Sequence, residues 1–214
     1  MDVQARIWTA LDGAAKVSRK VKVAKPPSAS KLAQLVEEAG PVGPELEAYF
    51  ACCNGAEVSG EPGLWSIEQM LDLDTPGYFA IRDDGCGNHD LVAPHFAVGS
   101  GCVVFRDHET EELSHLVASS LTAFVELWSI GARAAARGQA SPTLMKWPQD
   151  PMFMAEHDPP FAKLARSARF KKQLGPVALE LVDRKGRIKE RRGMNPFTRQ
   201  EMVIPAPPRT RRRP

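Results

Sequence analysis

The chain has 214 residues, of which 43% are hydrophobic and 25% charged, a composition typical of globular proteins. No uninterrupted apolar run approaches the roughly 18 residues of a membrane span. The first six residues, MDVQAR, lack the basic start and apolar core of a secretory signal. We therefore expect a cytoplasmic protein.

The charges are segregated along the chain. Residues 1–40 carry seven Lys/Arg and four Asp/Glu, residues 41–132 carry two and 15, and residues 133–214 carry 19 and seven. The net charges of the three parts are therefore +3, −13 and +12. Folding does not require such segregation, so we expect two surfaces of opposite potential, each able to steer an oppositely charged partner.

The first 27 residues are read as a basic N-terminal segment. Val3, Ile7 and Leu11 predict a weak amphipathic helix, and Pro26-Pro27 breaks any helix that precedes it.

Two helices are predicted next, at the start of an acidic domain that spans 28–137. Ser28 or Ser30 is expected to cap the first helix, which Gly40 ends. The second runs from Glu45 to about Cys53, where Asn-Gly tolerates the left-handed conformation of a helix end.

Short strands and Gly-rich turns follow, and they predict an antiparallel sheet. A strand around Leu64 leads into a helix, Ile67–Leu73, that Ser66 caps. The strand candidates after it are Tyr78–Arg82, His89–Ala93 and Cys102–Arg106. Residues 119–137 then return to a helical period, with a core stripe formed by Leu121, Phe124, Val125 and Trp128.

The C-terminal third is basic and rich in proline. Residues 138–160 are expected to form a linker that packs through Met145, Trp147, Met152 and Phe153. In the extension 161–206 we expect a basic helix (Phe161–Leu174), a hairpin (177–182 with 187–191) and a third strand (202–204). Residues 207–214 are Pro- and Arg-rich and are expected to be disordered. The predicted fold class is α+β: a mixed, mainly antiparallel sheet flanked by helices, with a basic C-terminal extension that contains a β-hairpin.

Three pieces of the acidic domain, taken in order and spacing, resemble the SUKH superfamily of bacterial toxin-immunity proteins and yeast cell-wall assembly regulators. The pieces are PELEAYF at 44–50 with CNGA at 53–56 and LWSIE at 64–68, then AI at 80–81 with DGCGN at 84–88, then VVFRDHE at 103–109 with LVASSLTAF at 116–124. The resemblance covers about residues 28–135. It implies a non-catalytic binding protein with a mixed antiparallel sheet, and it leaves residues 1–27 and everything after 138 unexplained.

The segment RGMNPFTRQEMVIPA at 192–206 is similar to the DNA-binding arm of bacterial histone-like HU proteins. Arg199 stands where that arm has a glycine, and the rest of an HU body is absent. The alternative interpretation is a basic hairpin that packs on the domain. The nucleic-acid-binding candidates of the extension are Arg184, Lys185, Arg187, Lys189, Arg191 and Arg192.

No residue constellation supports catalysis, a metal or a cofactor. Adjacent residues of a strand alternate faces, so Asp107-His108-Glu109 converges poorly on one ion, and we read it as a polar turn at the sheet edge. Gly85-x-Gly87 is too short for a dinucleotide fingerprint. The four cysteines form no CxxC pair and are read as reduced.

Acidic residues of the predicted turns form either a solvated surface or a face that captures a basic partner. The candidate partner-binding residues are Asp83, Asp84, Asp107, Glu109, Glu111 and Glu112. The leading prediction is a non-enzymatic immunity protein that neutralises a basic, nuclease-like toxin. The alternative is a nucleic-acid-associated regulator that acts through the basic extension.

Overall fold

The computed structural model describes residues 1–58, 61–73, 77–109, 113–139, 151–174, 179–182, 188–194 and 201–204. Its helices are α1 (Val3–Ala15), α2 (Ala29–Ala39), α3 (Gly43–Cys52), α4 (Ile67–Leu71), α5 (Leu121–Ala136), α7 (Pro151–His157), α8 (Phe161–Arg166) and α9 (Ala168–Leu174). Its strands are β1 (Val21–Val23), β2 (Ala56–Val58), β3 (Glu61–Leu64), β4 (Phe79–Asp83), β5 (His89–Ala93), β6 (Cys102–Arg106), β7 (Leu113–Ala118), β8 (Leu179–Val182), β9 (Ile188–Met194) and β10 (Glu201–Ile204).

Helix α1 belongs to the central core. The Asp2 carboxylate accepts a hydrogen bond from the Ala5 amide at 2.7 Å and caps the helix. Its apolar face, formed by Ile7, Leu11 and Ala14, is fully buried against α3 and α5. The N-terminal residues, expected as a segment outside the acidic domain, therefore share its core.

The N-terminal segment also contributes a strand to the domain. A three-stranded antiparallel sheet has the order β1-β2-β3. β1 comes from the N-terminal segment and pairs with β2, with Val21 opposite Val58. The sheet continues toward β4, because the Trp65 amide donates to the Ile81 carbonyl at 2.9 Å.

The expected N-terminal caps of α2 and α4 are confirmed, but α4 ends at Leu71 rather than at the expected Leu73. The Ser28 hydroxyl accepts from the Lys31 amide at 3.4 Å, so Ser28 rather than Ser30 caps α2, and Gly40 ends it with a φ of 94°. Ser66 forms a capping box with Gln69 at the start of α4.

The second sheet has four antiparallel strands in the order β4-β5-β6-β7. β5 and β6 have the predicted bounds. β7 was not expected, because its sequence was read as the approach to the last helix of the domain. Two register shifts between β6 and β7 interrupt the apolar alternation from which a strand is predicted.

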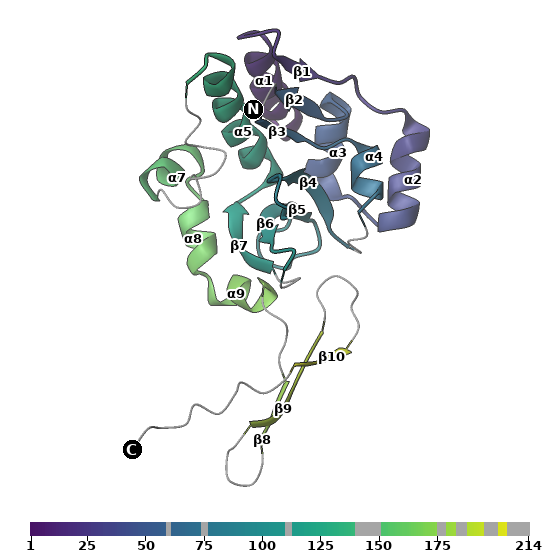
Figure 1. Cartoon of the computed structure of the whole chain (residues 1–214), viewed down its shortest axis with the longest axis vertical. Helices are drawn as coiled ribbons and strands as arrows, with labels where there is room; N and C mark the ends of the chain where they lie inside the picture. Colours follow the sequence, from purple (N-terminus) through teal and green to yellow (C-terminus); the bar gives the residue numbers. More distant parts are fainter. Residues whose placement is uncertain are drawn as a thin grey trace.

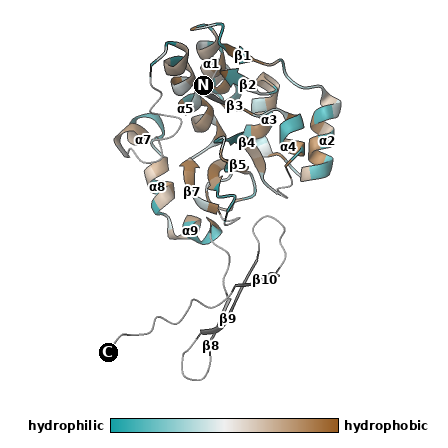
Figure 2. Ribbon diagram, viewed as in Figure 1, coloured by the Kyte–Doolittle hydropathy of each residue, from teal (hydrophilic) through white to brown (hydrophobic). Residues whose placement is uncertain are grey.

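Helices cover both faces of this sheet (Figure 1). On one face, Phe79, Ile81 and Val103 pack in the core shared with α1, α3 and α5. On the other, Ala80, Leu91 and other apolar residues pack with Phe170 of α9 and against Leu164 of α8. Figure 2 shows apolar colour on β7, between these layers, and hydrophilic colours on α2, α4 and α9. The predicted stripe of α5 is fully buried.

The described part of the expected linker, 151–160, forms α7 and docks on the domain. Met154 is 1% exposed, whereas Met152, which was expected to pack, is 83% exposed; Phe153 is partly buried against the core. The buried Asp158 carboxylate accepts from the Ser119 amide at 2.7 Å. Met145 and Trp147 lie outside the described residues.

The predicted basic helix 161–174 is two helices. Ser167 leaves the helical conformation with a ψ of 122°, and its hydroxyl accepts from the Phe170 amide at 3.3 Å. This break allows both Leu164 and Phe170 to contact the sheet cluster.

The extension forms a third antiparallel sheet in the order β10-β9-β8. Leu179 pairs with Arg192 and Glu201 with Met194, so the predicted hairpin and third strand are confirmed. The tail 207–214 lies outside the described residues.

The α+β fold class is confirmed, and every strand pairing among the described residues is antiparallel. None of the helices in this part of the chain has the length and apolar composition needed to cross a bilayer.

Candidate functional site

Two acidic connections meet at one end of the four-stranded sheet. The strands are antiparallel, so the β4–β5 turn and the β6–β7 connection lie at the same end, while the β5–β6 loop lies at the other. Asp83 is the last residue of β4, Asp84 begins the first connection, and Asp107 and Glu109 lie in the second. Glu111 and Glu112 lie outside the described residues.

Hydrogen bonds to the aspartates fix the β4–β5 turn. Asp84 accepts from the amides of Cys86 at 2.8 Å and Asn88 at 3.2 Å, and from the Asn88 side chain at 2.7 Å. Partial burial acts to raise the pKa of Asp84, but these hydrogen bonds outweigh it and hold the pKa below its ordinary value. The carboxylate is therefore kept in its charged form.

Asn88 joins the two acidic connections. Its side-chain oxygen accepts from the His108 amide at 3.1 Å and lies 2.8 Å from the His108 ring Nδ1. Gly87 has a φ of 93°, and a Cβ there would lie 3.3 Å from the same ring. The side chain of Asp107 in turn accepts from the Glu109 amide at 2.8 Å. Hydrogen bonds thus join the two connections that carry these four acidic residues, Asp83, Asp84, Asp107 and Glu109, which we call the acidic end.

A buried ion pair lies beneath the acidic end. The side chains of Arg82 and Asp90 are 6% and 4% exposed, and Arg82 Nη2 lies 2.6 Å from the Asp90 carboxylate. Burial raises the pKa of Asp90, against the opposing effect of the Arg82 charge. Arg82 is one of only two Lys/Arg between residues 41 and 132. Because its charge is used by Asp90 below the surface, it does not neutralise the acidic end.

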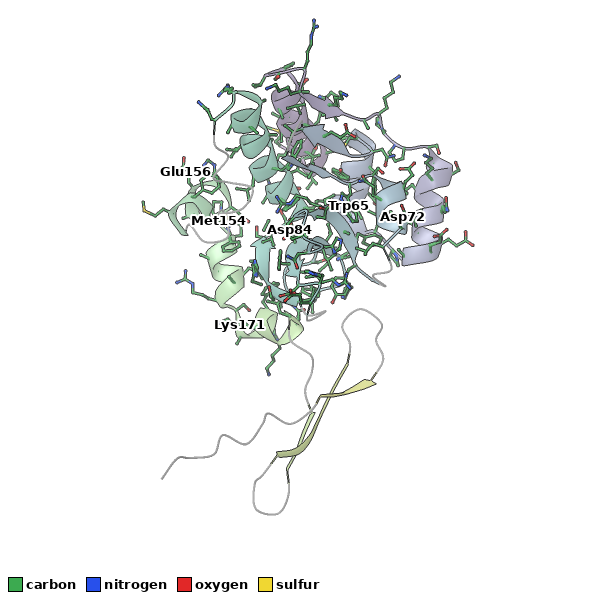
Figure 3. The ribbon with its side chains drawn as sticks, in the orientation of Figure 1. Trp65, Asp72, Asp84, Met154, Glu156 and Lys171 are labelled. Atoms are coloured by element: carbon green, nitrogen blue, oxygen red, sulfur yellow. The ribbon has the colours of Figure 1, made fainter. Side chains whose placement is uncertain are left out.

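Trp65 is the site residue that the sequence did not reveal as one. Its indole N–H donates to the Asp83 carboxylate at 3.2 Å, and its ring contacts His89 edge-on, with centroids 5.4 Å apart. The side chain is half-buried; Figure 3 draws Trp65 and Asp84 in the central part of the domain. Trp is enriched among the residues that dominate protein interfaces. No local pattern marks position 65, since its place depends on the backbone hydrogen bond from Trp65 to Ile81 of β4.

The acidic end offers hydrogen-bonding groups and negative charge. Within the described ranges, no group of three or more His, Cys, Asp or Glu side chains is placed to hold a metal ion. His108 is bonded to Asn88 rather than to a nucleophile. The Asp107-His108-Glu109 triplet forms the polar connection at the sheet edge.

The predicted nucleic-acid-binding residues are only partly placed. Lys189, Arg191 and Arg192 lie in β9, the central strand of the third sheet. Arg184, Lys185 and Arg187 lie outside the described residues.

Neither the known protein-family models nor the curated protein sequences give a match to this chain.

Proposed function

We propose that this protein is a cytoplasmic, SUKH-type immunity protein that binds a basic protein toxin at its acidic end. The observation that carries the proposal is the link through Asn88, which holds two acidic connections together. A nuclease binds phosphates in a basic cleft, and carboxylates gathered on two linked connections suit the same cleft. Complementary charge raises the association rate and selects the partner.

The half-buried Trp65 supports the proposal with an aromatic anchor beside Asp83. Charge alone gives steering, whereas lasting complexes need packed contacts near the centre of the interface. The buried Cys52, Cys53 and Cys102 are free thiols. Burial raises the pKa of Cys102 to about 12 and keeps its thiol protonated and unreactive, which is compatible with a reducing compartment.

The test uses variants that leave the turn intact. Asp84 holds the backbone of the turn, so its reversal would alter the fold as well as the charge. The variant Glu109→Lys/Glu111→Lys/Glu112→Lys keeps that turn. The control, Glu37→Lys/Glu38→Lys/Glu47→Lys, changes the net charge equally at exposed positions of α2 and α3.

Tagged forms of each are used to capture partners from cells of the source organism. We expect the wild type and the control to retain the same basic protein, and the acidic-end variant to lose it. With the captured protein purified, the association rate at low salt should fall for the acidic-end variant and much less for the control. If both variants captured the basic protein equally well, its binding site would not be the acidic end.

A second function is proposed for the extension: sequence-independent binding of nucleic acid. The observation that favours it is that β9, which carries Lys189, Arg191 and Arg192, is paired on both sides in an antiparallel sheet. Strands of β-ribbons and β-sheets are known to enter DNA grooves. The variant Lys189→Gln/Arg191→Gln/Arg192→Gln should weaken DNA binding and reduce its salt dependence; unchanged binding contradicts this function.

A further inference from the structure

The N-terminal part of the domain carries a group of exposed basic residues. Between Gly13 and Val36 the chain has six Lys/Arg and no Asp/Glu. Two of these cations are paired: Lys16 with Asp12 at 2.5 Å and Lys31 with Glu68. The remaining four form no ion pair with any described residue, and all are exposed; they are Arg19, Lys20, Lys22 and Lys25. We call these four the basic strap.

The backbone of the strap is fixed to the domain. The Val21 amide donates to the Ser18 carbonyl at 3.0 Å, and the Ala24 amide donates to the Gly55 carbonyl at 3.0 Å. Between these points β1 pairs with β2. Val21 is buried, so its neighbour Lys22 in β1 points to the opposite, exposed side. Arg19 and Lys20 lie exposed in the turn before the strand, and Lys25 lies exposed after it. The four cations are therefore carried on one short segment whose backbone is bonded to the domain.

Groups of both charges lie on the elements next to the strap. Figure 1 shows α1 and α5 side by side, with the strap following the C-terminal end of α1. The last turn of α5 carries Arg133, which lines a depression of about 220 Å³ together with the paired Arg6 and Glu126. Glu57 lies opposite Lys22 on β2 and is the acidic residue nearest to the strap in the strand register.

We infer that the strap binds the sugar–phosphate backbone of a nucleic acid, without reading its sequence. Three of its four cations are lysines, and the two valines between them are turned to the core: Val21 is 5% exposed, and Val23 is partly buried against the core. Lysine is depleted in protein–protein interfaces, whose centres need exposed apolar or aromatic anchors. Phosphate contacts, by contrast, need only exposed cations. The strap therefore suits nucleic acid better than an acidic protein.

The experiment uses the full chain and a labelled DNA duplex of about 20 base pairs, with affinity measured by fluorescence anisotropy at several salt concentrations. The strap variant is Arg19→Gln/Lys20→Gln/Lys22→Gln/Lys25→Gln. The control variant, Lys163→Gln/Arg169→Gln/Lys171→Gln/Lys172→Gln, removes the same charge from exposed positions of α8 and α9. A third variant, Arg19→Lys/Lys20→Arg/Lys22→Arg/Lys25→Arg, keeps the charge of the strap.

We expect the strap variant to bind about tenfold or more weakly at about 50 mM salt, and its slope of log affinity against log salt to be shallower by up to about 3.6, because each phosphate contact contributes about 0.9. The control should lose less than about threefold, and the charge-keeping variant should bind as the wild type does. Three outcomes would each overturn the inference: no binding of DNA by the wild type, equal affinities of the strap variant and the wild type, or equal losses in the strap variant and the control.

Discussion

Two carboxylates, one buried and one partly buried, join elements that are distant in the sequence. Asp158, after α7, is 1% exposed and accepts hydrogen bonds from the amide and hydroxyl of Ser119. Glu45 of α3 accepts from the amide of Thr122 at 2.8 Å and from its hydroxyl at 3.2 Å. Both therefore satisfy polar groups where β7 ends and α5 begins.

Replacement of Asp158 by alanine should destabilise the protein by about 1–3 kcal/mol, because the Ser119 amide is left buried without a partner. The control is Glu156→Ala, since the Glu156 side chain is 76% exposed; it should change stability by less than about 0.5 kcal/mol. Urea unfolding of the two variants measures the difference. Equal stabilities would mean that α7 does not dock through Asp158.

Glu45 makes the stability of the fold depend on pH. Burial raises the pKa of Glu45 above its ordinary 4.5, although the hydrogen bonds from Thr122 oppose the shift. The native state then holds this proton more tightly than the unfolded chain, so the carboxyl's contribution to stability falls as pH rises from 4.5 through the raised pKa.

Glu45→Gln removes this titration and keeps an acceptor for the Thr122 amide. The stability of the wild type relative to this variant should therefore decrease between about pH 4 and pH 7 in urea unfolding. A difference that does not vary with pH, or that increases, contradicts the raised pKa.

At the scale of the elements, the sequence predicted the helices that begin at a capping residue. Ser28 and Ser66 were predicted as caps because their side chains bond to nearby amides, and these contacts depend on sequence neighbours alone. β7 was missed because its bulges are set by pairing with β6. The break at Ser167 was missed because it follows from the surface of the sheet on which both short helices pack.

Alanine substitutions at Gly55 and Gly13 should change the stability of the protein in opposite directions. Gly55 has a φ of 94°, and a Cβ there would lie 2.9 Å from the Leu64 carbonyl oxygen. Gly13 lies in α1, and a Cβ there would have no atom within 4 Å. Gly55→Ala should therefore destabilise the protein by about 1–3 kcal/mol, whereas Gly13→Ala should stabilise it by about 0.5–1 kcal/mol. Thermal unfolding of the two variants should give shifts of opposite sign; shifts of the same sign would contradict the positions of these glycines.

At the scale of the whole molecule, the sequence predicted which segments are apolar but not what they pack against. Ile7 and Leu11 were assigned to a helix, but only the fold shows that α1 lies on α5. The same holds for the candidate site. The acidic residues were found from their number and their turns, whereas the link from Asn88 to His108 spans 20 residues of the chain and depends on strand order. Trp65 joins Asp83 for the same reason.

Residues 41–132 are strongly acidic, whereas residues 133–214 are strongly basic. We therefore predict that the basic tail, residues 207–214, covers the acidic end of its own molecule. Residues 207–214 contain Arg209, Arg211, Arg212 and Arg213, with no Asp or Glu. A tethered cationic segment has a high effective concentration at an acidic surface of the same molecule. Such a tail would compete with any basic partner and would slow its binding.

The test compares the full chain with the variant Arg209→Gln/Arg211→Gln/Arg212→Gln/Arg213→Gln, using a lysine peptide of about ten residues as the basic probe. If the tail covers the acidic end, the variant should bind the peptide more tightly than the wild type at low salt. The difference should vanish at about 0.5 M salt, where charges separated by more than a few ångströms are screened. Adding Glu109→Lys/Glu111→Lys/Glu112→Lys to both chains should remove the gain, which separates a tail at the acidic end from a tail at another site. Equal binding of the peptide by the wild type and the tail variant at low salt would show that the tail leaves the acidic end open.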